Sequence, residues 1–327
     1  MRRVGTVLLS LAAALLVVPV PAAAAVDCSA ATLPVLPGSA GGGSGAAILD
    51  SDTFLGWMLD PSQGVIWDNG TVSSLAISPS AVNSGGLVVG DVGTGTPHAA
   101  RMQLGGSPET GSTRPSQMED VNSAGDSVGW RTNVFAPPTD WDALWWKHGD
   151  AAPTLLPGPY QTSASAIDDL GNIVGYGQTA QGGREWIVWG PDGTIKREFG
   201  PYTSGQTVIA TTDIDDGIAV ADRDPAVGET DIVLINVDTG AMTPVAGSSG
   251  WVSRQISNGS VLAQSADLST YRLWHNGGTF NLPSPAGLGY AHPIDLNVIG
   301  STAIVVGFAY PETGPGFFET PVVWRCG

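Results

Sequence analysis

The sequence predicts an all-β fold: a seven-bladed β-propeller whose last blade is closed by the N-terminal strand. Three observations predict it. A turn-centred motif recurs about every 40 residues, each repeat also contains an apolar strand ending in Trp, and the last repeat lacks its final strand. Repeats of this length with several short strands are typical of propeller blades.

The first landmark of each repeat is an Asn or Asp turn that leads into a strand ending in Val-Gly. In the third unit it reads Asp120-Val121-Asn122-Ser123-Ala124-Gly125, followed by Ser127-Val128-Gly129. The anchor residues are spaced by 34, 39, 46, 47, 42 and 40 positions, and they are Ile48, Val82, Val121, Ile167, Ile214, Ile256 and Leu296. An Asn or Asp side chain can bond nearby backbone N–H groups, so we expect a turn between the first two strands of each blade.

The second landmark is an apolar strand that ends in Trp before a tight turn. In the third unit, Leu144-Trp145-Trp146 precedes His148-Gly149-Asp150, and elsewhere Asn-Gly or Asp-Gly follows the Trp. Such dipeptides tolerate positive φ and close hairpins. We expect His148 and His275 to be solvated residues of these hairpins. The recurrence of Trp at one repeat position favours packing between blades over a sugar-binding platform; these residues are Trp67, Trp146, Trp189, Trp274 and Trp324.

The repeat resembles that of the HAF-repeat family of extracellular proteins, which runs Ile-Asn-x-x-Gly-x-Ile-Val-Gly and continues into an aromatic-rich strand ending in Trp. The resemblance covers nearly all of the chain after residue 25 and is best in units two, three and four. Unit five departs, because Ala221 replaces the Gly and Asn236 replaces the Trp. The resemblance implies a propeller-like architecture and an extracellular setting, and it brings no established catalytic residues.

The last unit ends with Val322-Val323-Trp324, close to the C-terminus, so its fourth strand must come from elsewhere. The segment 32–38 looks like the fourth strand of unit three, Thr154–Gly158. A blade shared between the two termini would protect the edges of the ring. We therefore predict a disulfide between Cys28 and Cys326, in place of the missing turn.

The leader predicts export. Arg2 and Arg3 precede an apolar run and small residues, which is the pattern of a secretory signal peptide over residues 1–25, with cleavage after Ala25. Residues 26–327 then form one propeller domain of a secreted, bacterial protein. Cys28 leaves a lipoprotein conceivable, although Asp27 before it argues against that. No later stretch is long and apolar enough for a membrane span.

The charge excludes one class of partner. The formal net charge is −17, and it becomes −19 once the two leader arginines are removed. A chain this acidic is repelled by phosphate backbones, so nucleic acid is not expected as a partner. No cofactor motif and no zinc spacing is recognisable. The run Asp213–Gly217 admits a calcium interpretation, but the repeat explains it better as turn capping.

Function is predicted only as a class. We expect a monomeric binding or interaction module for an unknown extracellular ligand, either carbohydrate or protein. Its ligand-binding residues would lie in variable second-to-third-strand loops; they are Phe135, Trp141, Tyr310, Phe317 and Phe318. The alternative is an extracellular hydrolase or lyase acting on carbohydrate or a lactone. Its polar residues would converge near the channel, and they are Arg184, Asp222, Arg223, Asp224 and Glu229.

Overall fold

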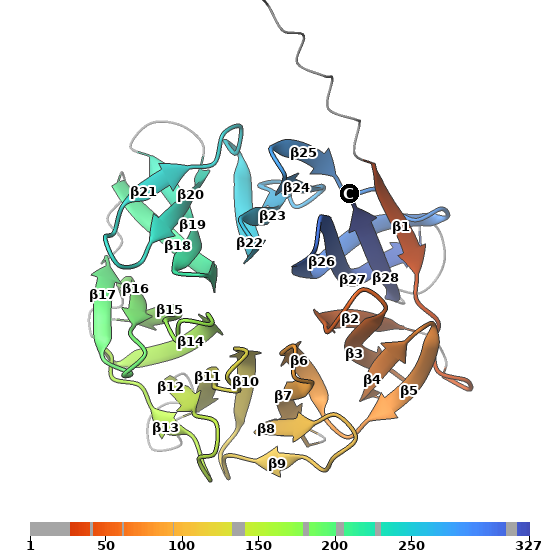
Figure 1. Cartoon of the computed structure of the whole chain (residues 1–327), viewed down its shortest axis with the longest axis horizontal. Helices are drawn as coiled ribbons and strands as arrows, with labels where there is room; N and C mark the ends of the chain where they lie inside the picture. Colours follow the sequence, from red (N-terminus) through yellow and green to blue (C-terminus); the bar gives the residue numbers. More distant parts are fainter. Residues whose placement is uncertain are drawn as a thin grey trace, which may run out of the picture.

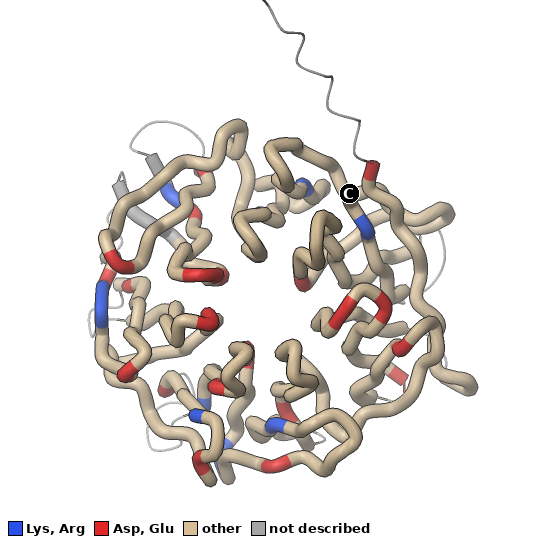
Figure 2. Tube along the Cα trace, viewed as in Figure 1, with Lys and Arg blue, Asp and Glu red and all other residues tan. Residues whose placement is uncertain are grey.

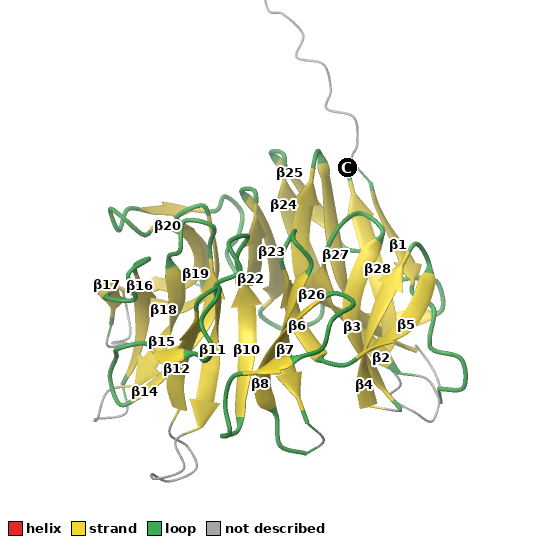
Figure 3. Ribbon diagram, turned by 60° about the horizontal axis from the view of Figure 1, so that its bottom comes forward, coloured by secondary structure: helices red, strands yellow, loops and turns green. Residues whose placement is uncertain are grey.

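The computed structural model describes residues 27–39, 42–60, 62–93, 95–132, 141–178, 183–200, 206–225, 230–311 and 319–327. Every element in these ranges is a β-strand, and the strands form seven four-stranded antiparallel sheets arranged in a ring (Figure 1). In an oblique view, turned by 60° from that of Figure 1, the strands of the blades stand upright around the ring (Figure 3). The predicted seven-bladed propeller is confirmed. None of the described segments forms a helix able to cross a membrane.

Each blade runs outward from the central channel in chain order. The innermost strands are β2 (Gly43–Ile48), β6 (Ser78–Val82), β10 (Ser116–Val121), β14 (Gln161–Ile167), β18 (Gln206–Asp215), β22 (Trp251–Ser257) and β26 (Leu288–Ile299). The second strands are β3 (Thr53–Leu59), β7 (Leu87–Val92), β11 (Ser127–Thr132), β15 (Ile173–Gln178), β19 (Ile218–Pro225), β23 (Ser260–Ser265) and β27 (Thr302–Pro311).

The two remaining positions complete the blades. The third strands are β4 (Ser62–Asp68), β8 (His98–Gln103), β12 (Trp141–Trp146), β16 (Arg184–Trp189), β20 (Asp231–Asn236), β24 (Tyr271–His275) and β28 (Thr320–Cys326). The outermost strands are β5 (Thr71–Leu75), β9 (Glu109–Thr110), β13 (Thr154–Leu155), β17 (Ile195–Phe199), β21 (Met242–Pro244), β25 (Gly278–Asn281) and β1 (Cys28–Thr32). All seven anchors lie at or near the ends of innermost strands.

The hydrophobic core lies between neighbouring blades. In the cluster between blades 3 and 4, Val128 and Trp145 of one blade pack with Ile167 and Trp189 of the next. Four of the five repeat Trp side chains are almost completely buried, which confirms that they pack. The repeat Gly has a steric reason. A Cβ on Gly129 would lie 2.0 Å from the carbonyl oxygen of Gln117 on the inner strand, too close for any side chain.

The Asx turns also join one blade to the next. Asn122 Oδ1 accepts the backbone N–H of Asp126 in its own turn, while Asn122 Nδ2 donates to the carbonyl of Asp168 in blade 4 at 3.2 Å. In turn, Asp168 Oδ2 accepts the N–H of Gly217 in blade 5 at 2.7 Å. Since Asn122 and Asp168 are buried, each of these bonds is shielded from water. The repeat Asx is therefore both a turn cap and a link between blades.

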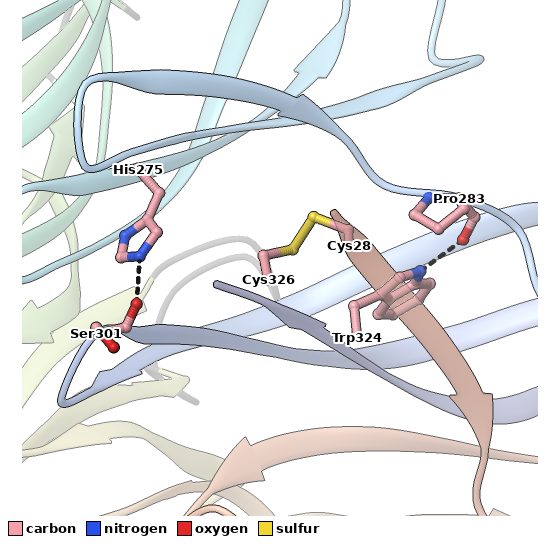
Figure 4. Close-up of a disulfide and its surroundings, with 6 residues drawn as sticks. All are labelled: Cys28, His275, Pro283, Ser301, Trp324 and Cys326. Atoms are coloured by element: carbon pink, nitrogen blue, oxygen red, sulfur yellow. Dashed lines mark hydrogen bonds between the residues drawn. A yellow bond between two sulfur atoms is a disulfide. The ribbon is translucent and has the colours of Figure 1, made fainter. Parts of the chain in front are cut away.

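The termini close the ring as predicted. β1 pairs with β28 as the outer strand of blade 7, and Cys28 is bonded to Cys326, its direct cross-strand partner (Figure 4). The strand begins four residues earlier than the segment 32–38 that resembles a fourth strand. The disulfide joins the end of β28 to the start of β1, the place at which a turn joins the third and fourth strands of the other blades.

One histidine prediction is wrong. His148 is exposed, as expected, but His275 is only 4% exposed. Its Nδ1 lies 2.8 Å from Ser260 Oγ, and its Nε2 lies 2.9 Å from the carbonyl oxygen of Ser301 in blade 7 (Figure 4). The imidazole is therefore a buried connector between blades 6 and 7. A hairpin position alone did not reveal this, because the burial comes from the neighbouring blade.

Candidate binding site on the loop face

The two faces of the ring differ. Strand direction places the loops from second to third strand, and from one blade to the next, on one face, here called the loop face. The Asx turns and the third-to-fourth-strand hairpins form the other, the hairpin face. A cavity of about 510 Å³ runs between the inner strands of all seven blades. Acidic residues recur around the inner ends of the blades (Figure 2).

Every inner strand carries the same irregularity. In all seven blades, the pairing of the first and second strands shifts by one residue at the same place in the repeat, which leaves an inner-strand residue unpaired there; blades 5 and 7 have a second shift nearer the start of the strand. Such a bulge re-aims a side chain. Six of these residues line the cavity, and they are Ala46, Ser80, Glu119, Ser165, Thr212 and Ile294. The seventh is Arg254 of blade 6. The bulges thus set which side chains the channel presents.

Three buried aspartates next to the bulges bind the blades together. Asp120 Oδ2 accepts the N–H of Ile167 in blade 4, at 2.8 Å. Asp213 Oδ2 accepts the N–H of Ile256 in blade 6 at 2.9 Å. Asp295 Oδ2 accepts the N–H of Ile48 in blade 1 at 3.0 Å. Burial raises the pKa of Asp120 to about 6 and that of Asp295 to about 7. Because each carboxylate is engaged by backbone amides, its role is structural.

Four aromatic rings form a continuous row across blades 3 and 4, here called the blade 3–4 arc. Trp130, Trp141, Tyr176 and Trp186 contact one another in that order, with ring centroids 5.8, 6.4 and 5.8 Å apart. Trp141 is 37% exposed, whereas Trp186 is buried. Trp130 Nε1 donates to Glu119 Oε1 at 2.7 Å, which fixes the ring beside the channel.

A second row, the blade 6–7 arc, lies on the same face and comprises Tyr271, Tyr290, His292, Phe308 and Tyr310. His292 stacks on Phe308 with an interplanar angle of 20°, and Phe308 meets Tyr310 edge-on. Tyr271 Oη lies 2.8 Å from His292 Nδ1. Burial lowers the pKa of His292, so the imidazole is neutral at pH 7. This row offers rings and hydroxyl groups together.

The structure places only some of the predicted ligand-binding residues. Trp141 lies in the blade 3–4 arc and Tyr310 in the blade 6–7 arc, so both share the loop face but in separate clusters. Phe135, Phe317 and Phe318 lie outside the described residues. Sequence reasoning missed most of both arcs. One signal was available, because the residue after the repeat Gly is aromatic in four units, at Trp57, Trp130, Tyr176 and Phe308.

The polar residues of the enzyme alternative do not form one cluster. Asp222 is 4% exposed and accepts the N–H of Ser253 at 2.7 Å, and burial raises its pKa to about 6. Arg223 forms a two-bond ion pair with Asp231. Arg184 is exposed in blade 4. Glu229 and the side chain of Asp224 lie outside the described residues.

The acidic run considered for calcium has other partners. Asp213 Oδ2 accepts the N–H of Ile256, and Asp215 Oδ2 accepts the N–H of Asn258, both in blade 6. In the ranges that the structure covers, no group of three or more His, Cys, Asp or Glu side chains is arranged to hold a metal ion. These aspartates therefore act as links between blades 5 and 6.

Comparison with known proteins shows the fold alone. No protein-family description and no curated protein sequence matches the chain. A puromycin hydrolase S511A mutant complexed with PGG is similar with a TM-score of 0.57 and 13% identity, over 84% of this chain and 52% of that one. A Mycobacterium tuberculosis puromycin-hydrolyzing peptidase is similar with a TM-score of 0.54 and 12% identity, over 86% of this chain and 53% of that one. The chain thus spans about half the length of these two peptidases.

A third similar structure is a propeller by itself. It is the β-propeller domain of the Trilobed protease from Pyrococcus furiosus, with a TM-score of 0.58 and 10% identity, over 88% of this chain and 94% of that one. That domain is described as having an open velcro topology. The present chain differs from that description, since β1 and the disulfide close its ring.

Proposed function

We propose that this protein is a secreted binding module that takes an extracellular ligand on its loop face, next to the channel mouth. The leader pattern of residues 1–25 and the Cys28–Cys326 disulfide support an extracellular setting, since disulfides persist in oxidising compartments. The HAF-like repeat supports the same setting. A ring closed by a disulfide and by bonds between blades is a rigid frame for such a site.

The blade 3–4 arc carries this proposal. Aromatic side chains bury large areas at little entropic cost and are enriched in recognition sites. In the arc Trp141 contacts the rings of Trp130 and Tyr176 and is still 37% exposed. A partly exposed Trp held by other rings on two blades is a preformed contact surface for a flat or ring-shaped ligand group.

The enzyme alternative has weaker support. The propellers of the similar peptidases cover about half of their chains, and a shared fold does not carry an activity over. Here Asp222 and Arg223, two of the five polar residues considered for that alternative, are engaged by Ser253 and Asp231. Their roles are explained by packing and ion pairing, so the geometry favours binding.

A screen of glycans, polysaccharides and extracellular proteins with parallel turnover assays tests the proposal. We expect saturable binding that Trp141→Ala weakens at least tenfold, while its unfolding midpoint stays within about 2 °C of the wild type, as is usual for a surface substitution. Leu155→Ala, a change of an exposed apolar residue on the outer strand of the same blade, is the matched control. Turnover that persists through purification and is lost in Asp222→Asn would overturn the proposal.

A further inference from the structure

Arg254 is the only Lys or Arg on any of the seven innermost strands. It occupies the bulge position of blade 6, where the other blades place small, polar or acidic residues that line the channel. In a chain with 13 basic and 30 acidic residues, one cation at this place is unexpected on composition alone. The bulge between Ser253 and Gln255, which sets the direction of the Arg254 side chain, has a counterpart in every blade.

The guanidinium group of Arg254 is held by a neutral partner. Its Nη2 donates to Gln264 Oε1, and among the described residues no carboxylate oxygen lies within 4.0 Å of it. Burial raises the pKa of Asp222 on the adjoining blade and the charge of Arg254 lowers it in part, so the two groups attract each other, while the Asp222 carboxylate accepts the N–H of Ser253. A half-buried guanidinium group with no carboxylate within 4.0 Å among the described residues can take a bound anion as its direct charged partner.

The neighbourhood of Arg254 is built to hold its position. Gln264 is 1% exposed, and its Nε2 donates to the carbonyl of Leu268 and to Tyr290 Oη. Tyr290 Oη donates to the same carbonyl. Leu268 adopts a left-handed backbone, with φ of +63°, and is 52% exposed. Backbone strain of this kind is often found at ligand sites.

The groups around Arg254 indicate what the anion is attached to. Tyr290 and His292 offer ring faces and edges, and the hydroxyl group of the buried Tyr271 holds the His292 ring through its Nδ1. His292 is the other titratable base here, and burial and Arg254 keep it neutral by lowering its pKa. The channel adds some hydroxyl and amide groups, including Thr212 and Gln255, among apolar and acidic side chains. Aromatic faces with neutral hydrogen-bonding groups suit a sugar ring.

We infer that Arg254 recognises the carboxylate of a uronic acid unit in a saccharide ligand, whose ring packs on the blade 6–7 arc. A guanidinium fork matches a carboxylate in two-point geometry, so Arg254 sets specificity for acidic over neutral sugars. A short oligosaccharide suits this site, since the net negative charge of the protein opposes long polyanions. The inference rests on the proposed binding function and names its ligand class.

The test is calorimetric titration of the mature protein with tri-galacturonate and with its fully methyl-esterified form. The two probes share the ring and differ in charge. We expect the acid to bind at least tenfold more tightly, and Arg254→Gln to remove that preference while leaving ester binding within twofold. Arg254→Lys should retain part of the preference, and raising the salt concentration should reduce it.

Lys196→Gln, which removes a positive charge from the outer strand β17, is the control for the overall field and should leave the preference unchanged. Equal binding of acid and ester, unaltered in Arg254→Gln, would overturn the inference and leave the binding function standing. Failure of both probes to bind would also overturn it, while a positive result in the wider ligand screen would still support the binding function. Unchanged thermal unfolding of Arg254→Gln shows that the loss is one of recognition.

Discussion

The indole N–H of Trp67 in blade 1 donates to the carbonyl of Pro34, which follows the N-terminal strand, at 2.6 Å. Trp189 makes the same bond to Pro157, and Trp324 to Pro283 (Figure 4). In each case the Trp lies at or near the end of a third strand, and the Pro follows the outer strand of the preceding blade. The N-terminal segment is thus packed in the same way as an ordinary fourth strand.

Ring closure predicts the effect of removing the disulfide. The double variant Cys28→Ser/Cys326→Ser should lower the free energy of unfolding by roughly 4 kcal/mol, because the bond closes a very long loop. Urea titration followed by Trp fluorescence measures the change. Faster hydrogen exchange should be confined at first to β1 and β28. An unfolding midpoint equal to that of the wild type would show that strand pairing alone closes the ring.

The buried aspartates predict that stability falls as pH rises. Burial raises the pKa of Asp120 and Asp295 in the folded protein to about 6 and 7, above the ordinary value of 3.8. Between pH 4 and 7 the folded protein therefore binds more protons than the unfolded chain, so protonation favours folding. We expect the unfolding temperature to be about 2–5 °C higher at pH 5 than at pH 8.

Asp295→Asn separates this effect from the net charge. Its amide nitrogen cannot accept the N–H of Ile48, so stability should fall at pH 5, and the remaining difference between pH 5 and pH 8 should shrink. Asp267→Asn is the control for charge, since Asp267 is exposed in a loop. If Asp295→Asn shows the same difference in unfolding temperature between pH 5 and pH 8 as the wild type, the pH dependence does not come from Asp295.

The Asx links predict an unusual cost for a conservative change. Asn122→Asp keeps the oxygen that caps its own turn but removes the donor to the carbonyl of Asp168. Because that carbonyl would then face a buried carboxylate, we expect a loss of about 1–3 kcal/mol in chemical unfolding. Ser123→Ala, an exposed change in the same turn, should cost little. Equal stability of the two variants would mean that the link between blades is not energetically significant.

Much of the fold followed from the repeat. The anchors Val121 and Ile167 mark inner strands because the Asx turn and the repeat Gly both have strict local requirements. The register of β1 did not follow, since Thr32 resembles Thr154 in sequence while the pairing is decided by the Cys28–Cys326 contact. His275 was misjudged for a similar reason, as its partner Ser301 belongs to another blade.

The candidate site was less accessible to prediction. Loop position identified Trp141 and Tyr310, since variable loops stand out beside a repeat. Arg254 and His292 did not stand out, because a single charged or imidazole side chain on a strand has no sequence signature. Only the bulge in β22 and the packing of blade 7 against blade 6 bring them onto the same face of the ring.

Hydrogen-exchange footprinting with the tightest ligand from the binding screen tests the central claim most directly. A ligand held on the loop face should protect backbone amides around Trp130–Trp141 or around Arg254, Tyr271 and Tyr290, and should leave the Asx turns unchanged. Protection centred instead on the hairpin-face turns at Asn83, Asn122 and Asp168, with none on the loop face, would contradict the account.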